Sequence, residues 1–148
     1  MKKISREELN EMLVKHELWL KNKGGEQLNL ENVDLRDFKL PYADLKYANL
    51  NNADLRYADL RYADLKYTNL NNADLRYADL RYADLKYANL NNADLRYANL
   101  RCANLIKANL INADLECVET NYLTTGYHLA CPEEGSFIGY KIANECLV

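Results

Sequence analysis

Residues 46–65 read KYANLNNADLRYADLRYADL, and the next twenty residues repeat this block with one change, Thr68 in place of Ala48. Leucine stands at every fifth position from Leu30 to Leu115, eighteen times in succession. A period of five fits neither the 3.6-residue repeat of a helix nor the two-residue repeat of a strand. It indicates a solenoid, in which short units stack and each unit covers its neighbour.

The two repeat lengths together define the shape of one coil. Because the 20-residue block contains four units of five, the simplest coil has four sides with one unit on each. Successive coils would stack at the sheet spacing of about 4.8 Å. Eighteen units make about 4.5 coils. Three positions of each unit face outward in this arrangement, namely the residue before leucine and the two after it.

The unit A(D/N)LXX is typical of the pentapeptide-repeat family, and residues 41–115 follow it almost without exception. The chain resembles that family over roughly 90 of its 148 residues. The resemblance implies an all-β solenoid, a right-handed quadrilateral β-helix. It implies a core of the repeating leucines and alanines, beginning with Leu45, Leu50, Leu55, Ala43, Ala48 and Ala53.

An amphipathic capping helix is predicted within residues 1–25. Ser5–Glu8 has the spacing of a capping box, Ile4 and Leu9 are placed as a hydrophobic staple, and Gly24–Gly25 is expected to end the helix. The helix would cover the open first coil, since terminal repeats need a cap to remain soluble. Its apolar face would contain Leu9, Met12, Leu13, His16, Trp19 and Leu20.

Glycine is absent from residues 26–125, although a coil with four corners needs four tight turns. The Asp or Asn before each leucine is expected to serve instead, because these residues tolerate unusual backbone angles and bond nearby backbone groups. The pattern leaves the turn type open.

The repeat is expected to give way to a different structure after Leu115, because Thr120 stands where the next leucine is due. We therefore predict a β-helix over residues 26–115 and a small C-terminal cap over 116–148. Short strands are expected in the cap at residues 136–142 and 145–148.

The charges of the repeat are expected to neutralise one another locally. Every aspartate from Asp44 to Asp94 is followed two positions later by Lys or Arg. Where asparagine stands in place of the aspartate, at Asn49, Asn69 and Asn89, the residue two positions later is asparagine as well. The net charge of −3 comes largely from the tail, where residues 116–148 hold five acidic residues and one basic residue. The repeat body should therefore be a charge-balanced wall.

Tyrosines and arginines recur every twenty residues and should form ladders on the outer surface. Near the end of the repeat, cysteine replaces tyrosine and isoleucine enters an outward position, so that either the tail or a second subunit is expected to cover this region. The candidate interaction surface comprises Tyr57, Tyr77, Tyr97, Arg56, Arg76, Arg96, Cys102, Ile106 and Ile111.

No catalytic, metal or cofactor site is predicted. His16 belongs to the buried helix face, and His128 near Cys131 fits no zinc spacing. Ser5 and Ser136 lack a nucleophile elbow, and no glycine-rich phosphate loop is present. A narrow core of leucine and alanine would leave no pocket for a small molecule.

These features favour a non-enzymatic structural or interaction scaffold that presents a rigid wall to an unknown protein partner, as a monomer or as a homodimer through a coil end. Four cysteines without CxxC spacing are expected to be free thiols in the cytoplasm. No secretory signal or membrane span is expected.

Two alternatives remain open. Some pentapeptide-repeat proteins resemble duplex DNA and bind topoisomerases such as DNA gyrase, but that role depends on a strongly anionic rod, from which this chain departs. Ladders of tyrosine and arginine could instead bind single-stranded nucleic acid, although the interleaved aspartates would repel phosphate. We therefore expect no nucleic-acid partner.

Overall fold

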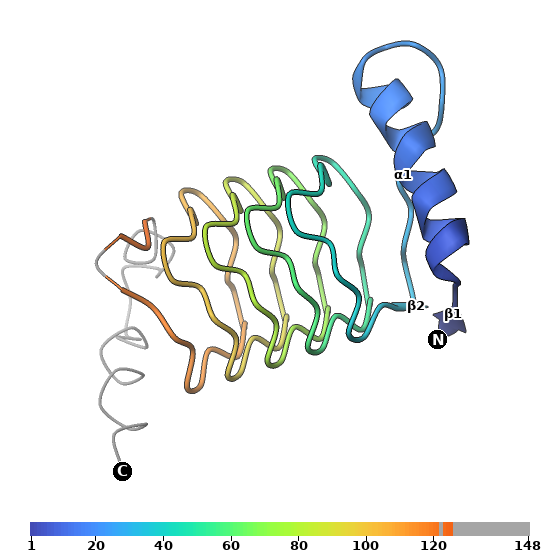
Figure 1. Cartoon of the computed structure of the whole chain (residues 1–148). Helices are drawn as coiled ribbons and strands as arrows, with labels where there is room; N and C mark the ends of the chain where they lie inside the picture. The colour runs from blue at the N-terminus through green and yellow to red at the C-terminus, as the bar shows by residue number, and fades with distance from the viewer. Residues whose placement is uncertain (122, 126–148) are drawn as a thin grey trace.

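The chain folds into a four-sided β-helix capped at its N-terminal end by a helix (Figure 1). The structure is a computed structural model that describes residues 1–121 and 123–125. Parallel β-bridges join positions twenty residues apart, as between Asp54 and Asp74 and between Asp59 and Asp79. This offset confirms one unit per side and four sides per coil, and the architecture is the right-handed quadrilateral β-helix that the family resemblance implied.

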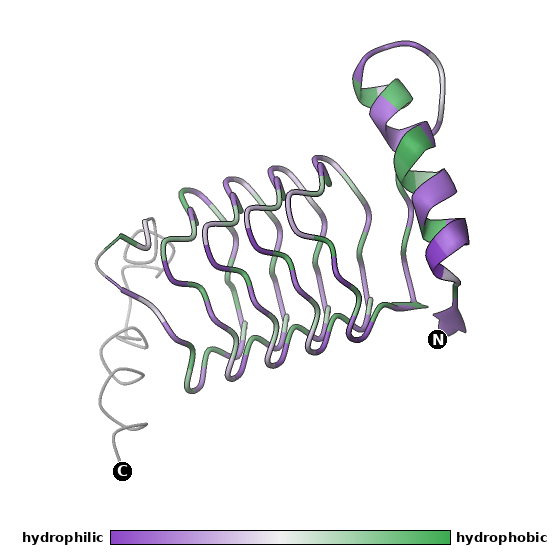
Figure 2. Ribbon diagram, in the orientation of Figure 1, coloured by the Kyte–Doolittle hydropathy of each residue, from purple (hydrophilic) through white to green (hydrophobic). Residues whose placement is uncertain are grey.

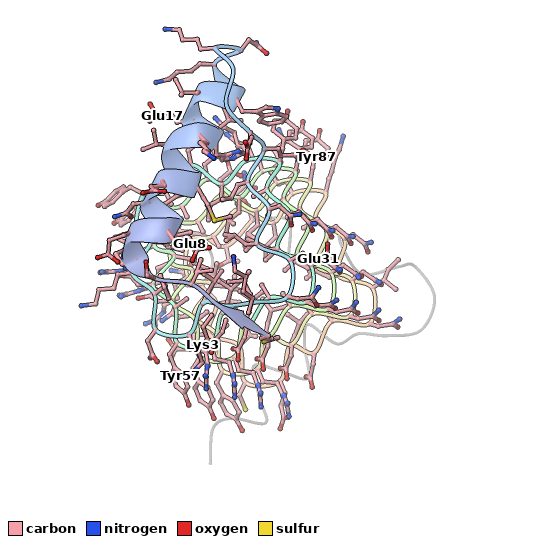
Figure 3. All side chains as sticks on the ribbon, turned by 90° about the vertical axis from the view of Figure 1, so that its right-hand side faces the viewer. Lys3, Glu8, Glu17, Glu31, Tyr57 and Tyr87 are labelled. Carbon is pink, nitrogen blue, oxygen red and sulfur yellow. The ribbon has the colours of Figure 1, made fainter. Side chains whose placement is uncertain are left out.

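Three named elements lie at the N-terminal end. Strand β1 (Lys2–Lys3) pairs in parallel with strand β2 (Val33–Asp34) and so extends one side of the first coil. Helix α1 (Arg6–Leu20) lies across the end of the stack (Figures 1 and 3). No helix in this described part of the chain is long and apolar enough to cross a membrane.

The four sides are named here by the leucines that they bury. Side A holds Leu35, Leu55, Leu75, Leu95 and Leu115; side B holds Leu40, Leu60, Leu80 and Leu100; side C holds Leu45, Leu65, Leu85 and Leu105; side D holds Leu30, Leu50, Leu70, Leu90 and Leu110. Apolar and polar residues alternate along every side (Figure 2). Each side therefore turns its leucine and alanine inward and its polar residues outward.

The core is made of leucine and alanine, as predicted. Most of the repeating leucines and alanines are at most 1% exposed, and Leu110 in the last coil is half-buried. Thr68, the one departure from alanine in the central coils, is also buried, and its hydroxyl donates to the Leu45 carbonyl at 2.8 Å. That bond satisfies the polar atom that Thr68 adds to the core.

The corners are built differently from the sequence prediction. The left-handed residue is the second one after leucine, such as Tyr47 with φ of 62°, and not the Asp or Asn before it. A hydrogen bond from Ala48 N–H to the Leu45 carbonyl at 3.0 Å closes the turn, and positive φ at its third residue fits a type II turn. Tyrosine tolerates this strained conformation because each corner is held by the coils above and below it.

The Asp or Asn before leucine has a second role, which was predicted correctly. The Oδ1 atom of Asp54 accepts the backbone N–H of Arg56 at 3.2 Å, and the same bond recurs through the repeat. Side B of the first coil is an exception, because Lys39 stands at this position. The residue two positions later is Pro41, which has no N–H to satisfy.

Helix α1 begins as predicted but ends earlier. The Ser5 hydroxyl accepts the Glu8 N–H at 3.1 Å. The helix ends at Leu20, and Asn22, with φ of 53°, is the left-handed residue that terminates it, in place of the expected Gly24. The Lys23 N–H donates to the Leu18 carbonyl, which is the bonding pattern of a Schellman motif.

The coil continues beyond Leu115 as far as the described residues extend. Glu119 bridges Asn99, and Thr125 bridges Asn104 with an offset of 21, so one residue has been inserted. Thr124 points inward like Thr68, and its hydroxyl donates to the Leu100 carbonyl at 2.9 Å. The predicted strands at residues 136–142 and 145–148 lie outside the described residues.

Candidate functional site

The six tyrosines and arginines of the predicted surface lie together at the corner between sides A and B. We call this group the Arg–Tyr corner; it consists of Arg56, Tyr57, Arg76, Tyr77, Arg96 and Tyr97. The rings of Tyr57 and Tyr77 stack with centroids 5.0 Å apart and planes 5° apart, and Tyr77 stacks on Tyr97 in the same way. The ring separation follows from the spacing between coils.

The tyrosines are exposed even though they are stacked. Tyr57 is 56% exposed, Tyr77 46% and Tyr97 45%. Figure 3 shows Tyr57 at one corner of the coil and Tyr87 at another. Because their neighbours hold them in place, these rings present a rigid apolar edge with a hydroxyl at its rim.

Each arginine of the corner is fixed by two aspartates. Arg76 donates from Nε to Oδ1 of Asp74 at 2.8 Å and from a terminal nitrogen to Oδ2 at 2.6 Å. Its Nε also lies 3.4 Å from Oδ2 of Asp94 in the next coil. Arginines stacked at this spacing would repel one another, but carboxylates alternate with the guanidinium groups along the column and offset that repulsion.

These pairs change the acidity of both partners. Burial raises the pKa of Asp54 and Asp94, but the hydrogen bonds from Arg56 and Arg96 outweigh it, so that the pKa of each carboxyl lies below its ordinary value. The hydrogen bond to Asp94 also raises the pKa of Arg96. Asp54, Asp94 and Arg96 therefore remain charged at neutral pH.

The local charge neutralisation predicted from the sequence is confirmed, except that one aspartate pairs with a lysine of the preceding coil. Seven of the eight pairs between Asp44 and Arg96 form within their own units. At the eighth, the ammonium of Lys86 lies 5.3 Å from the centre of the Tyr87 ring, and Asp84 is reached by Lys66 of the preceding coil at 3.5 Å.

The other predicted surface residues do not join the Arg–Tyr corner. Ile106 is half-buried on side C, whereas Ile111 is 55% exposed on side D. Cys102 is a free, half-buried thiol whose backbone N–H donates to the Asn121 side chain at 3.1 Å. Cys117 is disulfide-bonded, so the expectation of four free thiols is wrong.

Side D carries an arrangement that the sequence prediction missed. Its outward residues are asparagines, and their amides form ladders in which Asn71 donates to Asn51 at 3.0 Å and Asn91 donates to Asn71 at 2.9 Å. The N–H groups of the ladders point toward the N-terminal coil, where the exposed Glu31 stands at their end (Figure 3). The sequence contained one signal of this arrangement: Glu31 stands in the first coil at the position that Asn51 holds in the second.

Among residues 1–121 and 123–125, no group of three or more His, Cys, Asp or Glu side chains could hold a metal ion. A surface hollow of about 360 Å³ lies beside Lys3, Asp34 and Phe38 at the N-terminal end. The carboxylate of Asp34 is already bound there by Arg36 at 2.7 Å.

The fold and its surface define a class of protein, namely a β-solenoid whose outer positions repeat while its core stays constant. Residues 26–56, 53–91 and 88–118 match the family model for pentapeptide repeats, in eight copies. The chain belongs to the pentapeptide-repeat family. A comparison with curated proteins gave no match.

Solved structures of the family are similar to this chain. HetL, a pentapeptide-repeat protein involved in heterocyst differentiation regulation from the cyanobacterium Nostoc sp. strain PCC 7120, is 40% identical, with a TM-score of 0.51. The match covers 61% of this chain and 46% of HetL, so this chain spans less than half of HetL. Rfr23 from the cyanobacterium Cyanothece 51142 is 31% identical over 78% of this chain and 97% of its own, with a TM-score of 0.44.

A third solved structure is more distant. QnrB1, a plasmid-mediated fluoroquinolone resistance protein, is 14% identical over 64% of this chain and 60% of its own, with a TM-score of 0.30. Its role carries no argument for the function of this chain.

Proposed function

We propose that this protein is a non-enzymatic interaction scaffold that binds a protein partner through the Arg–Tyr corner. The supporting observation is the fixed geometry of that corner, where exposed tyrosines stack at 5.0 Å beside arginines held by two carboxylates each. Tyrosine and arginine, together with tryptophan, are enriched among the residues that dominate protein–protein binding energy. Side chains already held in place lose little conformational freedom when a partner binds.

The same geometry argues against the nucleic-acid alternatives. Stacked rings 5.0 Å apart leave no gap for a base, and each guanidinium already faces carboxylates that repel phosphate. A DNA mimic requires unpaired negative charge, whereas the aspartates of the central coils are paired with arginine or lysine. The disulfide at Cys117 favours an oxidising compartment over the cytoplasm that the sequence suggested, because thiols are kept reduced in the cytoplasm.

The test removes the rings without disturbing the turns. Asparagine already occupies the left-handed corner position at Asn52, with φ of 55°, so tyrosine-to-asparagine changes should preserve the fold. The corner variant carries Tyr57→Asn, Tyr77→Asn and Tyr97→Asn. The matched control carries Tyr42→Asn, Tyr62→Asn and Tyr82→Asn, which removes the ladder at the next corner.

Each protein is immobilised and offered host lysate, and the captured proteins are quantified by mass spectrometry and then tested individually for direct binding. A specific partner should bind the wild type and the control, and its affinity for the corner variant should fall at least about tenfold. Equal binding to the corner variant would refute the proposal. Inhibition of DNA gyrase supercoiling, or a salt-sensitive shift of an oligonucleotide, would replace it with one of the two alternatives.

A further inference from the structure

His16 is completely buried between helix α1 and the first coil. It is 0% exposed, and its ring stacks on Trp19 with centroids 5.7 Å apart. Trp19 in turn meets Tyr47 edge to face at 6.3 Å. The imidazole thus lies at the centre of the contact that holds α1 on the solenoid.

One nitrogen of His16 takes the place of a backbone group. In a regular coil, the N–H at the alanine position donates to the carbonyl three residues earlier, as from Ala48 to Leu45. Leu28 occupies this position in the first coil, and its N–H donates instead to Nδ1 of His16 at 3.0 Å. Because Nδ1 accepts a hydrogen bond, it must lack a proton, and the neutral ring carries its proton on Nε2.

The second nitrogen is also buried. Nε2 of His16 forms no hydrogen bond in the part of the chain that the structure describes. The Lys46 carbonyl lies close enough to influence the ring electrostatically, but a bond of normal geometry is not made. A second proton would therefore enter at Nδ1, where it would face the Leu28 N–H and abolish the bond that docks the helix.

We propose that α1 is an acid-sensitive cap, held on the first coil by neutral His16 and released when His16 becomes protonated. The charged groups facing His16 from the coil are Asp44 and Lys46, which pair with each other at 3.1 Å. On α1, the residues next to His16 in sequence are Lys15 and Glu17, and both are exposed. Glu26 faces Lys15 at 3.7 Å. No carboxylate in this set bonds the imidazole in a way that would favour its charged form.

The direction of the pH effect follows from burial. Desolvation lowers the pKa of His16 from 6.5 and outweighs the raising effects of the Lys46 carbonyl and Asp44. The docked state therefore prefers the neutral ring, so docking is complete above about pH 6.5 and weakens as the pH falls below it. The pKa values of Asp54 and Asp94 lie below their ordinary values, so the ion pairs of these two aspartates persist under the same conditions.

Two signals report release. Trp19 is the only tryptophan of the chain, and a released helix would expose it to a soluble quencher such as acrylamide. An isolated helix of 15 residues is marginal in water, so release should also remove helical circular dichroism at 222 nm. Both signals are recorded on the full chain between pH 7.5 and pH 5.0.

The two histidines provide a matched pair of variants. In His16→Gln, the side-chain oxygen can still accept the Leu28 N–H but cannot be protonated, so the helix should stay docked at every pH. In His128→Gln, the transition of the wild type should be unchanged. A wild type without a transition, or a His16→Gln variant with an unaltered one, would overturn the proposal.

If α1 fails to dock in His16→Gln at pH 7.5, a direct measurement on the wild type still tests the proposal. Nitrogen-15 NMR of the wild-type imidazoles reports the protonation of His16 itself. The proposal requires that His16 protonate together with the loss of the 222 nm signal. Protonation of His16 with full retention of helical signal would refute it.

Discussion

The carboxylate of Glu31 accepts the side-chain N–H of Asn51 at 3.1 Å through one oxygen and that of Asn49 at 3.1 Å through the other. The amides of Asn69 and Asn71 donate in turn to these two residues, so both ladders are aligned in one direction. An anion at their N–H end is favoured for the same reason that acidic residues favour a helix N-terminus.

Replacing this anion should weaken side D. In Glu31→Gln, one of the two acceptor oxygens becomes an NH₂ group that faces an asparagine N–H, and we expect a loss of about 1 kcal/mol in the free energy of unfolding. Urea unfolding followed by tyrosine fluorescence measures this loss. Glu11→Gln, at an exposed position on α1, is the control and should be neutral; equal losses in the two variants would contradict the role of Glu31.

Two adjacent glycines allow the effect of backbone strain to be distinguished from that of a steric clash. Gly24 and Gly25 both have positive φ, of 85° and 81°. A Cβ on Gly24 meets nothing within 4 Å, whereas one on Gly25 would lie 2.1 Å from the Lys15 carbonyl oxygen.

Gly24→Ala should therefore lower stability by about 1 kcal/mol through backbone strain alone. Gly25→Ala should in addition displace α1 from the coil, because the backbone at Lys15 cannot give way as a flexible side chain would. The accessibility of Trp19 to acrylamide distinguishes the two outcomes. Unchanged quenching in Gly25→Ala would show that the loop can move without releasing the helix.

A charge in the core should prevent folding. Leu75 is 0% exposed in the middle of the stack, so Leu75→Lys would bury an unpaired ammonium group and should abolish the cooperative unfolding transition. Leu75→Ala should lower the free energy of unfolding by about 2–5 kcal/mol.

Tyr77→Lys is the matched control, since Lys107 already occupies the same left-handed position in a later coil, with φ of 58°. Circular dichroism and size-exclusion chromatography should show a folded protein for Tyr77→Lys and not for Leu75→Lys. A folded Leu75→Lys would contradict the inward assignment of the leucines.

The arginine columns should protect the solenoid from acid. The lowered pKa of Asp54 means that the native state resists protonation, so this contribution to stability is present above about pH 3.8 and is lost as the pH falls further. In Arg56→Gln, the guanidinium group that lowers the pKa of Asp54 is lost while burial still raises it, so the pKa of Asp54 should rise.

Acid unfolding of Arg56→Gln should consequently begin at a higher pH than that of the wild type. Urea midpoints measured from pH 7 to pH 2 test this. Arg101→Gln is the control, because Arg101 is exposed and its ion pair within the described part of the chain, with Glu119, is long at 4.0 Å. The same acid sensitivity in both variants would argue against a specific effect at Asp54.

Much of the fold follows from the repeat, but several contacts do not. The inward leucines and the pairing of Asp54 with Arg56 depend on neighbours a few residues away or one repeat away, so they can be predicted from the pattern. The helix end and the corners were predicted at glycine and at Asp or Asn, because these residues adopt positive φ most readily. The structure places positive φ at Asn22 and at tyrosines such as Tyr47, where the stacked coils hold a strained conformation that residue preference does not predict.

The Arg–Tyr corner was predicted as part of a larger set. Its six members share one register, and a common register places side chains in one column. Ile106 and Ile111 belong to different sides, so their closeness in sequence did not make them part of the same surface.

The sequence by itself determined the coil, because a period of five in leucine within a 20-residue repeat places four buried leucines in each turn around a single axis. The tertiary structure decided what happens where the repetition stops. Residues at the ends, such as His16 and Glu31, bond backbone or amide groups that a further coil would otherwise satisfy. Those partners lie in other elements or other coils, so the sequence can mark where the repeat is broken, as at Glu31, but not which group that residue will bond.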